Sequence, residues 1–159
     1  MNATHKSLLS LIASIISLVL IGFIIGLSTK GGVDTWYATL HRSPLTPPNY
    51  VFGIAWSILY AMIATAGWFI WRAQPCPELP TIKKLFIAQL MLNWCWTPLF
   101  FTYHLIGSAL ACIMLIITLV ALLIITSYSK MPLAALLLMP YLLWLLFAAH
   151  LNFHIWLYD

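Results

Sequence analysis

The stretch GGVDTWYATLHRSPLTPPNYVFGIAWSILY, residues 31–60, decides the fold. Its first part is polar, and it passes through Pro47 and Pro48 directly into an apolar run that begins at Asn49. Prolines suit the first turn of a helix, because the backbone N–H that they lack would have no intrahelical partner there. The stretch therefore predicts a long loop that leads into a helix.

The composition does not fit a soluble domain. Of the 159 residues, 64% are hydrophobic and 6% are charged, whereas about a quarter of the residues in a soluble domain are charged. A membrane helix needs about 20 apolar residues. We expect an all-α integral membrane protein, a single domain over residues 1–159 that forms a five-helix transmembrane bundle with a long loop between the first two helices. The helices are expected at residues 7–27, 49–71, 82–101, 108–127 and 133–158.

The loop from Ser28 to Pro48 is longer than a simple connection between spans. Long ordered loops tend to be functional, and this one carries Trp36 and Tyr37. It can be a lid over the mouth of a cavity, or its aromatic residues can form a belt at the lipid headgroups. In the helix before it, Gly22 and Gly26 allow close approach of another helix, which we interpret as packing within one chain.

Three of the expected helices each present aromatic and neutral polar side chains on one face. At 100° per residue, each set falls within about 80° of arc. The sets are Phe52, Trp56 and Tyr60 on the second helix, Gln89, Asn93, Trp96 and Phe100 on the third, and Tyr141, Trp144, Ala148 and Asn152 on the fifth. If the three faces converge, they form an apolar pocket with a few hydrogen-bonding groups, as in many small-molecule sites. Alternatively, these residues fill the core of the bundle.

The chain lacks the residue patterns of several other function classes. The interiors of the expected spans contain no Asp, Glu, Lys or Arg, which ion-coupled transporters usually need there. The sequence has no nucleophile and base pair, so no catalytic residues are assigned, and no cofactor is expected. Its basic residues form no stripe, which argues against a nucleic-acid partner. His150 and His154 could share a metal ion, but we favour hydrogen bonding and predict no metal site.

The positive charges suggest an orientation in the membrane. Lys6, Arg72, Lys83, Lys84 and Lys130 lie on the amino-terminal side, and Lys30 and Arg42 lie on the other. This bias predicts that the amino terminus is inside. The short termini and the absence of a targeting presequence favour a bacterial inner membrane.

Four motifs spread along the chain carry a family resemblance: GVDTWYATL, TPPNYVFGIAWSILY, QLMLNWCWTPLFF and PYLLWLLFAAHLNFHIW. With them the sequence resembles a bacterial member of the tryptophan-rich sensory protein, or translocator protein, family, which includes the peripheral benzodiazepine receptor. The resemblance implies a five-helix bundle, commonly a homodimer, that binds porphyrins such as protoporphyrin IX, sterols and benzodiazepine-type ligands below the first loop. The family's pocket positions fall here on Trp56, Asn93, Phe100, Trp144 and Ala148, with Trp36 and Tyr60 as further contributors.

The resemblance implies a membrane receptor or sensor for flat hydrophobic ligands in tetrapyrrole or stress regulation. Two alternatives stay open: a light-dependent porphyrin-degrading photo-oxidase, in which Trp56 and Trp144 take part, and a facilitator of porphyrin or metabolite transport. Two departures from the family matter. Leu45 stands where the family commonly has tryptophan, which predicts different packing of the loop. The cholesterol-recognition pattern of animal members is absent near Phe153 and Leu157, so sterol binding is not carried over.

Overall fold

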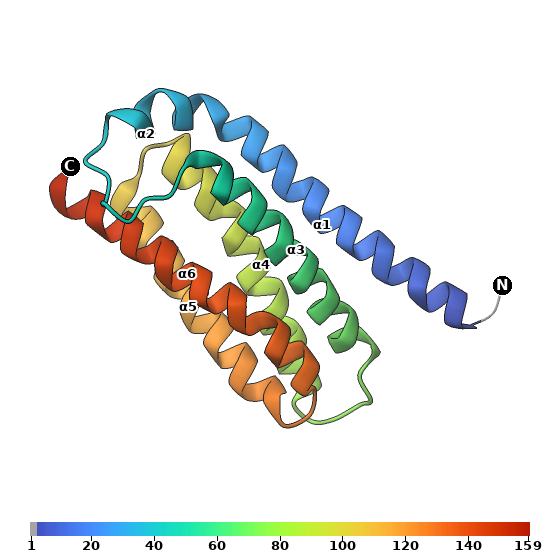
Figure 1. The fold of residues 1–159 in the computed structure, drawn as a ribbon. Coiled ribbons are helices and arrows are strands. Elements are labelled where there is room, and N and C mark those ends of the chain that lie inside the picture. Colours follow the sequence, from blue (N-terminus) through green and yellow to red (C-terminus); the bar gives the residue numbers. More distant parts are fainter. Residues whose placement is uncertain (1–2) are drawn as a thin grey trace.

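The computed structural model describes residues 3–159, which form six helices and, within that range, no strand (Figure 1). In chain order the helices are α1 (Ala3–Asp34), α2 (Trp36–Thr39), α3 (Asn49–Arg72), α4 (Leu79–Phe101), α5 (Ile106–Tyr128) and α6 (Pro132–Tyr158). Helix α2 is a single turn of 4 residues, and each of the others has 23 or more. Each predicted helix range lies inside one of these long helices.

The predicted loop from Ser28 to Pro48 is wrong over its first half. Helix α1 continues to Asp34 and is followed by α2, so the irregular chain before α3 covers only residues 40–48. Thr29 and Thr35 donate side-chain hydrogen bonds to the carbonyls of Ile25 and Gly31, four residues earlier, inside this extension. The prediction ended the first helix at Leu27, just before Lys30, whereas the helix continues past this charge and the packing at Gly32 brings its extension against α4.

Gly32 lies at a close contact between the extended part of α1 and the end of α4. A Cβ at this position would overlap the backbone carbonyl of Phe101 at the end of α4. Gly22 makes a similar approach to α3, because a Cβ there would overlap the ring of Tyr60. Both glycines allow α1 to lie close to its neighbours, and the packing of Gly22 is within the chain, as predicted.

The long helices form a bundle with α1 along one side (Figure 1). Helix α5 packs against α4 and α6, α3 packs against α1 and α6, and α1 also contacts α4. The amino terminus and the α3–α4 and α5–α6 connections lie at one end of the bundle, and α2 and the carboxyl terminus lie at the other. The core contains fully buried aliphatic residues such as Ile63, Ile116 and Leu138.

The outer faces of the helices are apolar. Ile125 and Leu143 are 72% and 67% exposed, and α1 exposes Leu8, Ile16 and Phe23. Among the residues described, α1, α3, α5 and α6 are long and apolar enough to cross a membrane by length and composition. Apolar surface of this extent is unfavourable in water but suits lipid. The chain is therefore an all-helical integral membrane protein.

Candidate functional site

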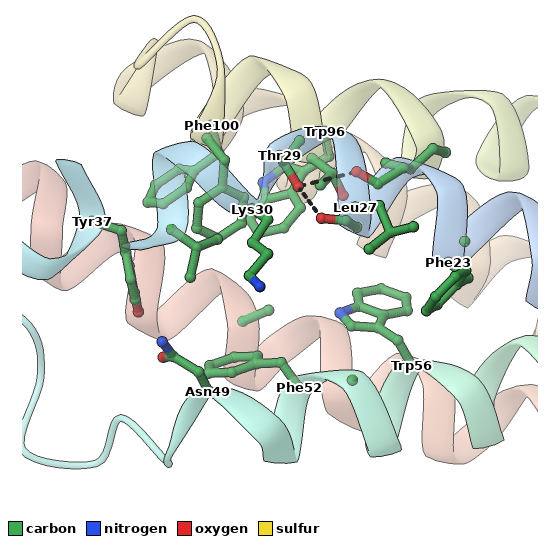
Figure 2. A pocket seen from close by; sticks show the side chains of 18 of the residues that line it. Phe23, Leu27, Thr29, Lys30, Tyr37, Asn49, Phe52, Trp56, Trp96 and Phe100 are labelled. Carbon is green, nitrogen blue, oxygen red and sulfur yellow. Dashed lines mark hydrogen bonds between the residues drawn. The ribbon is translucent and has the colours of Figure 1, made fainter. Parts of the chain in front are cut away.

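A cavity of about 470 Å³ lies where α1, α3, α4 and α6 come together, close to the end of the bundle that carries α2. Its volume falls in the range of roughly 300–1,000 Å³ that is typical of small-molecule sites. Aromatic rings from different helices surround it (Figure 2). Most of its lining is apolar, and a small number of polar side chains reach it, among them Lys30, Asn49 and Asn152.

The sequence predicts eleven ligand-binding residues, which are Trp36 and the members of the three sets other than Asn152. Seven of them line this cavity. They are Phe52, Trp56, Tyr60, Trp96, Phe100, Trp144 and Ala148. They come from α3, α4 and α6, so the three faces predicted from helical periodicity do converge on one space. The ring of Phe52 lies edge-on to Trp144, with centroids 5.9 Å apart, and Trp96 stacks on Phe100 at 5.5 Å. Ligand binding by these residues stays a prediction.

The other four predicted residues do not line the cavity. Trp36 stacks on His104 outside it, with ring centroids 4.1 Å apart. Gln89, Asn93 and Tyr141 are at most 3% exposed and lie within the core. The structure pairs the two amides, Gln89 and Asn93, with tyrosine hydroxyls of the protein and not with the cavity.

These buried groups form one chain of hydrogen bonds across three helices. The hydroxyl of Tyr60 donates to Oδ1 of Asn93 at 2.7 Å, and Nδ2 of Asn93 donates to the hydroxyl of Tyr141 at 3.0 Å. That hydroxyl donates to Oε1 of Gln89 at 3.0 Å, and Nε2 of Gln89 donates to the carbonyl of Phe86 at 3.0 Å. Because unpaired polar groups are costly in an apolar core, this chain fixes Tyr60 at the wall of the cavity.

Several polar atoms on lining residues have no partner. Nε1 of Trp96, Nε1 of Trp144 and Oδ1 of Asn152 are buried and make no hydrogen bond within the described part of the chain. Nδ2 of Asn152 donates to the carbonyl of Ile106 at 3.2 Å, so its amide orientation is held by the protein. Unsatisfied buried groups are uncommon in native structures. None of the three atoms is exposed to the cavity, although the residues that carry them line it.

Sequence reasoning missed the wall that α1 contributes. Val19, Gly22, Gly26, Lys30 and Val33 all line the cavity. Their spacing of three or four residues is the helical repeat, so it could have revealed this face if the first helix had been extended past Leu27. Asn152 was placed on the correct face of its helix but was not chosen as a site residue. The residue types on this face of α1 did not identify it as a binding surface, because its glycines are equally consistent with helix–helix packing.

Tyr37 of α2 covers the end of the cavity near Phe100. It is 5% exposed, and its ring lies edge-on to Phe100 and Phe101, with centroids 6.0 and 5.4 Å away. The guanidinium of Arg42 lies 5.6 Å from the centre of the same ring. Burial raises the pKa of Tyr37, and the charge of Arg42 opposes this shift. Tyr37 is therefore neutral at physiological pH and acts as an apolar cover.

The segment after α2 is attached to the end of α6. Nδ1 of His41 lies 2.9 Å from Oδ1 of Asp159, and the backbone N–H of His41 donates to Oδ2 at 2.9 Å. The hydrogen bond from the His41 side chain lowers the pKa of the Asp159 carboxyl. Nδ1 of His154 donates to the carbonyl of His41 at 3.1 Å. His154 is thus engaged in a backbone contact, and residues 3–159 contain no cluster of three or more His, Cys, Asp or Glu side chains suited to a metal ion.

Comparison with known proteins agrees with this architecture. Residues 13–157 match the model of the TspO/MBR family. The chain is 38% identical over 153 residues to the tryptophan-rich protein TspO of Archaeoglobus fulgidus, covering 96% of this chain and 99% of that protein. It is 35% identical over 142 residues to the translocator protein of Bos taurus, covering 85% and 81%. It is 32% identical over 120 residues to the tryptophan-rich sensory protein of Cereibacter sphaeroides, covering 76% and 74%. The chain is therefore a member of the TspO/MBR family of membrane proteins.

Proposed function

We propose that this protein is a membrane receptor or sensor that binds a porphyrin, such as protoporphyrin IX, or another flat hydrophobic ligand in the cavity between α1 and α3. The observation that carries the proposal is the convergence of Trp56, Trp144 and Phe100 on one apolar space. Aromatic side chains gain from offset or edge-to-face contact with conjugated rings. A flat polycyclic molecule suits such walls better than a sugar or a nucleotide.

The polar atoms at the cavity support a ligand with a few hydrogen-bonding groups. Lys30, Asn49 and Thr97 are among the lining residues, and their polar groups can pair with such groups of a ligand. A site with convergent polar groups in an apolar pocket is the usual form of small-molecule recognition. This combination favours a ligand over lipid chains as the occupant, because lipid chains have no groups to pair with these atoms.

The proposal includes a bundle of five membrane spans with the amino terminus on the cytoplasmic side of a bacterial inner membrane. Helix α4 has 23 residues, enough to cross the hydrocarbon core of about 30 Å at 1.5 Å per residue. The positive-inside rule supports the orientation, because five of the seven Lys and Arg residues lie at the amino-terminal end of the bundle. A homodimer, implied by the family resemblance, stays a prediction.

A binding titration tests the proposed function. Protoporphyrin IX is added in the dark to the detergent-purified protein, and the change in porphyrin absorbance is recorded. We expect saturable binding, weakened about tenfold or more by Trp144→Ala, since removing a large aromatic contact costs about 1.4 kcal/mol or more. Trp71→Ala is the matched control, because Trp71 is 48% exposed and does not line the cavity. Equal affinities of the two variants would contradict the site.

The photo-oxidase is a second candidate function. Trp56 and Trp144 both line the cavity, so a bound porphyrin would lie near two oxidisable indoles. The same sample under light separates the alternatives: a stable spectrum supports a receptor, and protein-dependent loss of the porphyrin bands supports degradation. The Trp56→Phe/Trp144→Phe double variant should then lose that activity. Porphyrin flux into liposomes that exceeds the protein-free rate would instead support a transport facilitator.

A further inference from the structure

Lys30 is a charged residue in the wall of a mostly apolar cavity. Among the lining residues, Lys30 supplies the positive charge and Asp34, one turn later on α1, supplies the negative charge. Figure 2 shows the side chain of Lys30 extending into the cavity, between Tyr37 and Asn49 on one side and Trp56 on the other. The indole nitrogen of Trp56 faces the same space. The amine is thus presented to whatever fills the cavity.

The amine of Lys30 is not neutralised by the protein. Within residues 3–159, His41 and Asp159 form an ion pair with N···O of 4.0 Å or less. Lys30 forms no such pair, although the acidic residue Asp34 lines the same cavity. Within residues 3–159 the side chain of Lys30 also makes no hydrogen bond of 3.5 Å or less, whereas its neighbour Thr29 bonds to the carbonyl of Ile25. An ammonium group carries three donors and no acceptor. It is therefore free to bind an anionic group of a ligand.

The position of Lys30 along α1 also fits an amphiphilic acid. The uncharged run before it, from Ser7 to Thr29, has a length of roughly 34 Å at 1.5 Å per residue, close to the hydrocarbon thickness of about 30 Å. Lys30 therefore lies at the level where the membrane core gives way to the headgroups. A ligand in the cavity can keep its flat apolar body among the aromatic rings and place a carboxylate at this level.

We infer that Lys30 forms a subsite that binds a peripheral carboxylate of the flat apolar ligand. The inference rests on the proposed function and adds to it the residue that recognises the acidic group of the ligand. The carboxylate binds the ammonium group of Lys30, and the N–H of Trp56 faces the same space. A neutral ester of the same molecule keeps the stacking contacts and loses the charge pairing.

A membrane anchor is the competing role for this lysine. A lysine near the end of a span commonly extends its amine toward the headgroups. In that role Lys30 would contribute equally to the binding of acidic and neutral ligands, or to neither. The two roles therefore differ in whether the effect of a substitution depends on the charge of the ligand.

The test compares protoporphyrin IX, which has two carboxylates, with its dimethyl ester, using the full chain in one non-ionic detergent. We expect Lys30→Gln to weaken binding of the diacid by up to about fivefold, the range for an ion pair of an exposed side chain, and to leave binding of the ester unchanged. Lys30→Arg should retain the preference for the diacid. Lys130→Gln, which removes the same charge at the opposite end of the bundle, should bind both like the unchanged protein. Added salt should weaken the binding of the diacid more than the binding of the ester.

Three results would overturn the inference. Equal loss of diacid and ester binding in Lys30→Gln would show that the lysine supports the shape of the protein, and thermal unfolding of the variant would identify that cause. Unchanged diacid binding in Lys30→Gln would remove the subsite while leaving the proposed function intact. If the unchanged protein binds neither compound, the proposed function itself fails, and the inference fails with it.

Discussion

At the residue scale, the main feature is the hydrogen-bonded chain from Tyr60 through Asn93 and Tyr141 to Gln89. Neutral amides deep in an apolar bundle need partners. The protein supplies these partners from two other helices and leaves the cavity to aromatic side chains. Each hydroxyl or amide in the chain depends on its neighbour, so the effect of removing one group spreads to the next.

Tyr141→Phe should therefore destabilise the protein. The change removes the hydroxyl that accepts from Asn93 and donates to Gln89, and it leaves one group of each amide without a partner. We expect the free energy of unfolding to fall by about 1–2 kcal/mol, measured by denaturant titration in detergent micelles. Tyr128→Phe is the matched control, because Tyr128 is 62% exposed. Equal free energies of unfolding for the two variants would show that the hydrogen bonds of Tyr141 do not stabilise the protein.

At the element scale, two glycines of α1 make close contacts with neighbouring helices. Gly22 and Gly32 lie against Tyr60 and the carbonyl of Phe101, whereas Gly26 and Gly31 have nothing within 4 Å of where a Cβ would be. The two close approaches lie on either side of Gly26, which lines the cavity. The close approach of backbone to backbone at Gly32 also explains why this segment stays helical instead of forming a loop.

Substitution of the two adjacent glycines of α1 separates packing from helix propensity. Gly32→Ala should lower the midpoint of thermal unfolding, because the new methyl group meets a backbone carbonyl that cannot rotate away, at a cost of about 1–3 kcal/mol. Gly31→Ala places its methyl group in open space, so it should be neutral or slightly stabilising, by up to about 1 kcal/mol. Equal midpoints for the two variants would contradict the close contact between α1 and α4.

At the scale of the whole molecule, α4 decides the topology. Its sequence is less apolar than those of α1, α3, α5 and α6 because it carries Lys83, Lys84 and the buried amides, and it is not among the helices that length and composition alone mark as spans. It nevertheless packs along α5 within the bundle (Figure 1). If α4 crosses the membrane, the connections before and after it face opposite sides.

Cysteine labelling tests this topology. In a background with Cys95→Ala and Cys112→Ala, the native Cys76 reports on the α3–α4 connection, and a variant with Tyr103→Cys and Cys76→Ala reports on the α4–α5 turn. We expect a membrane-impermeant maleimide to label the Tyr103→Cys protein in intact cells and to label Cys76 only after the cells are opened. The reverse result would invert the orientation, and labelling of both positions from one side would show that α4 does not cross.

The sequence by itself determined the helical membrane class, the helix ranges after Pro48 and the faces on which Trp56, Phe100 and Trp144 lie, because these follow from hydropathy and helical periodicity. That these faces converge on one cavity was decided by the tertiary structure. The family membership also followed from its motifs. Only the tertiary structure decided that α1 continues to Asp34, that Gln89, Asn93 and Tyr141 pair with the protein, and that Lys30 reaches the cavity. Periodicity gives the face on which a residue lies, whereas the depth of each face depends on how closely the helices approach, and that distance is set by contacts between residues far apart in the chain.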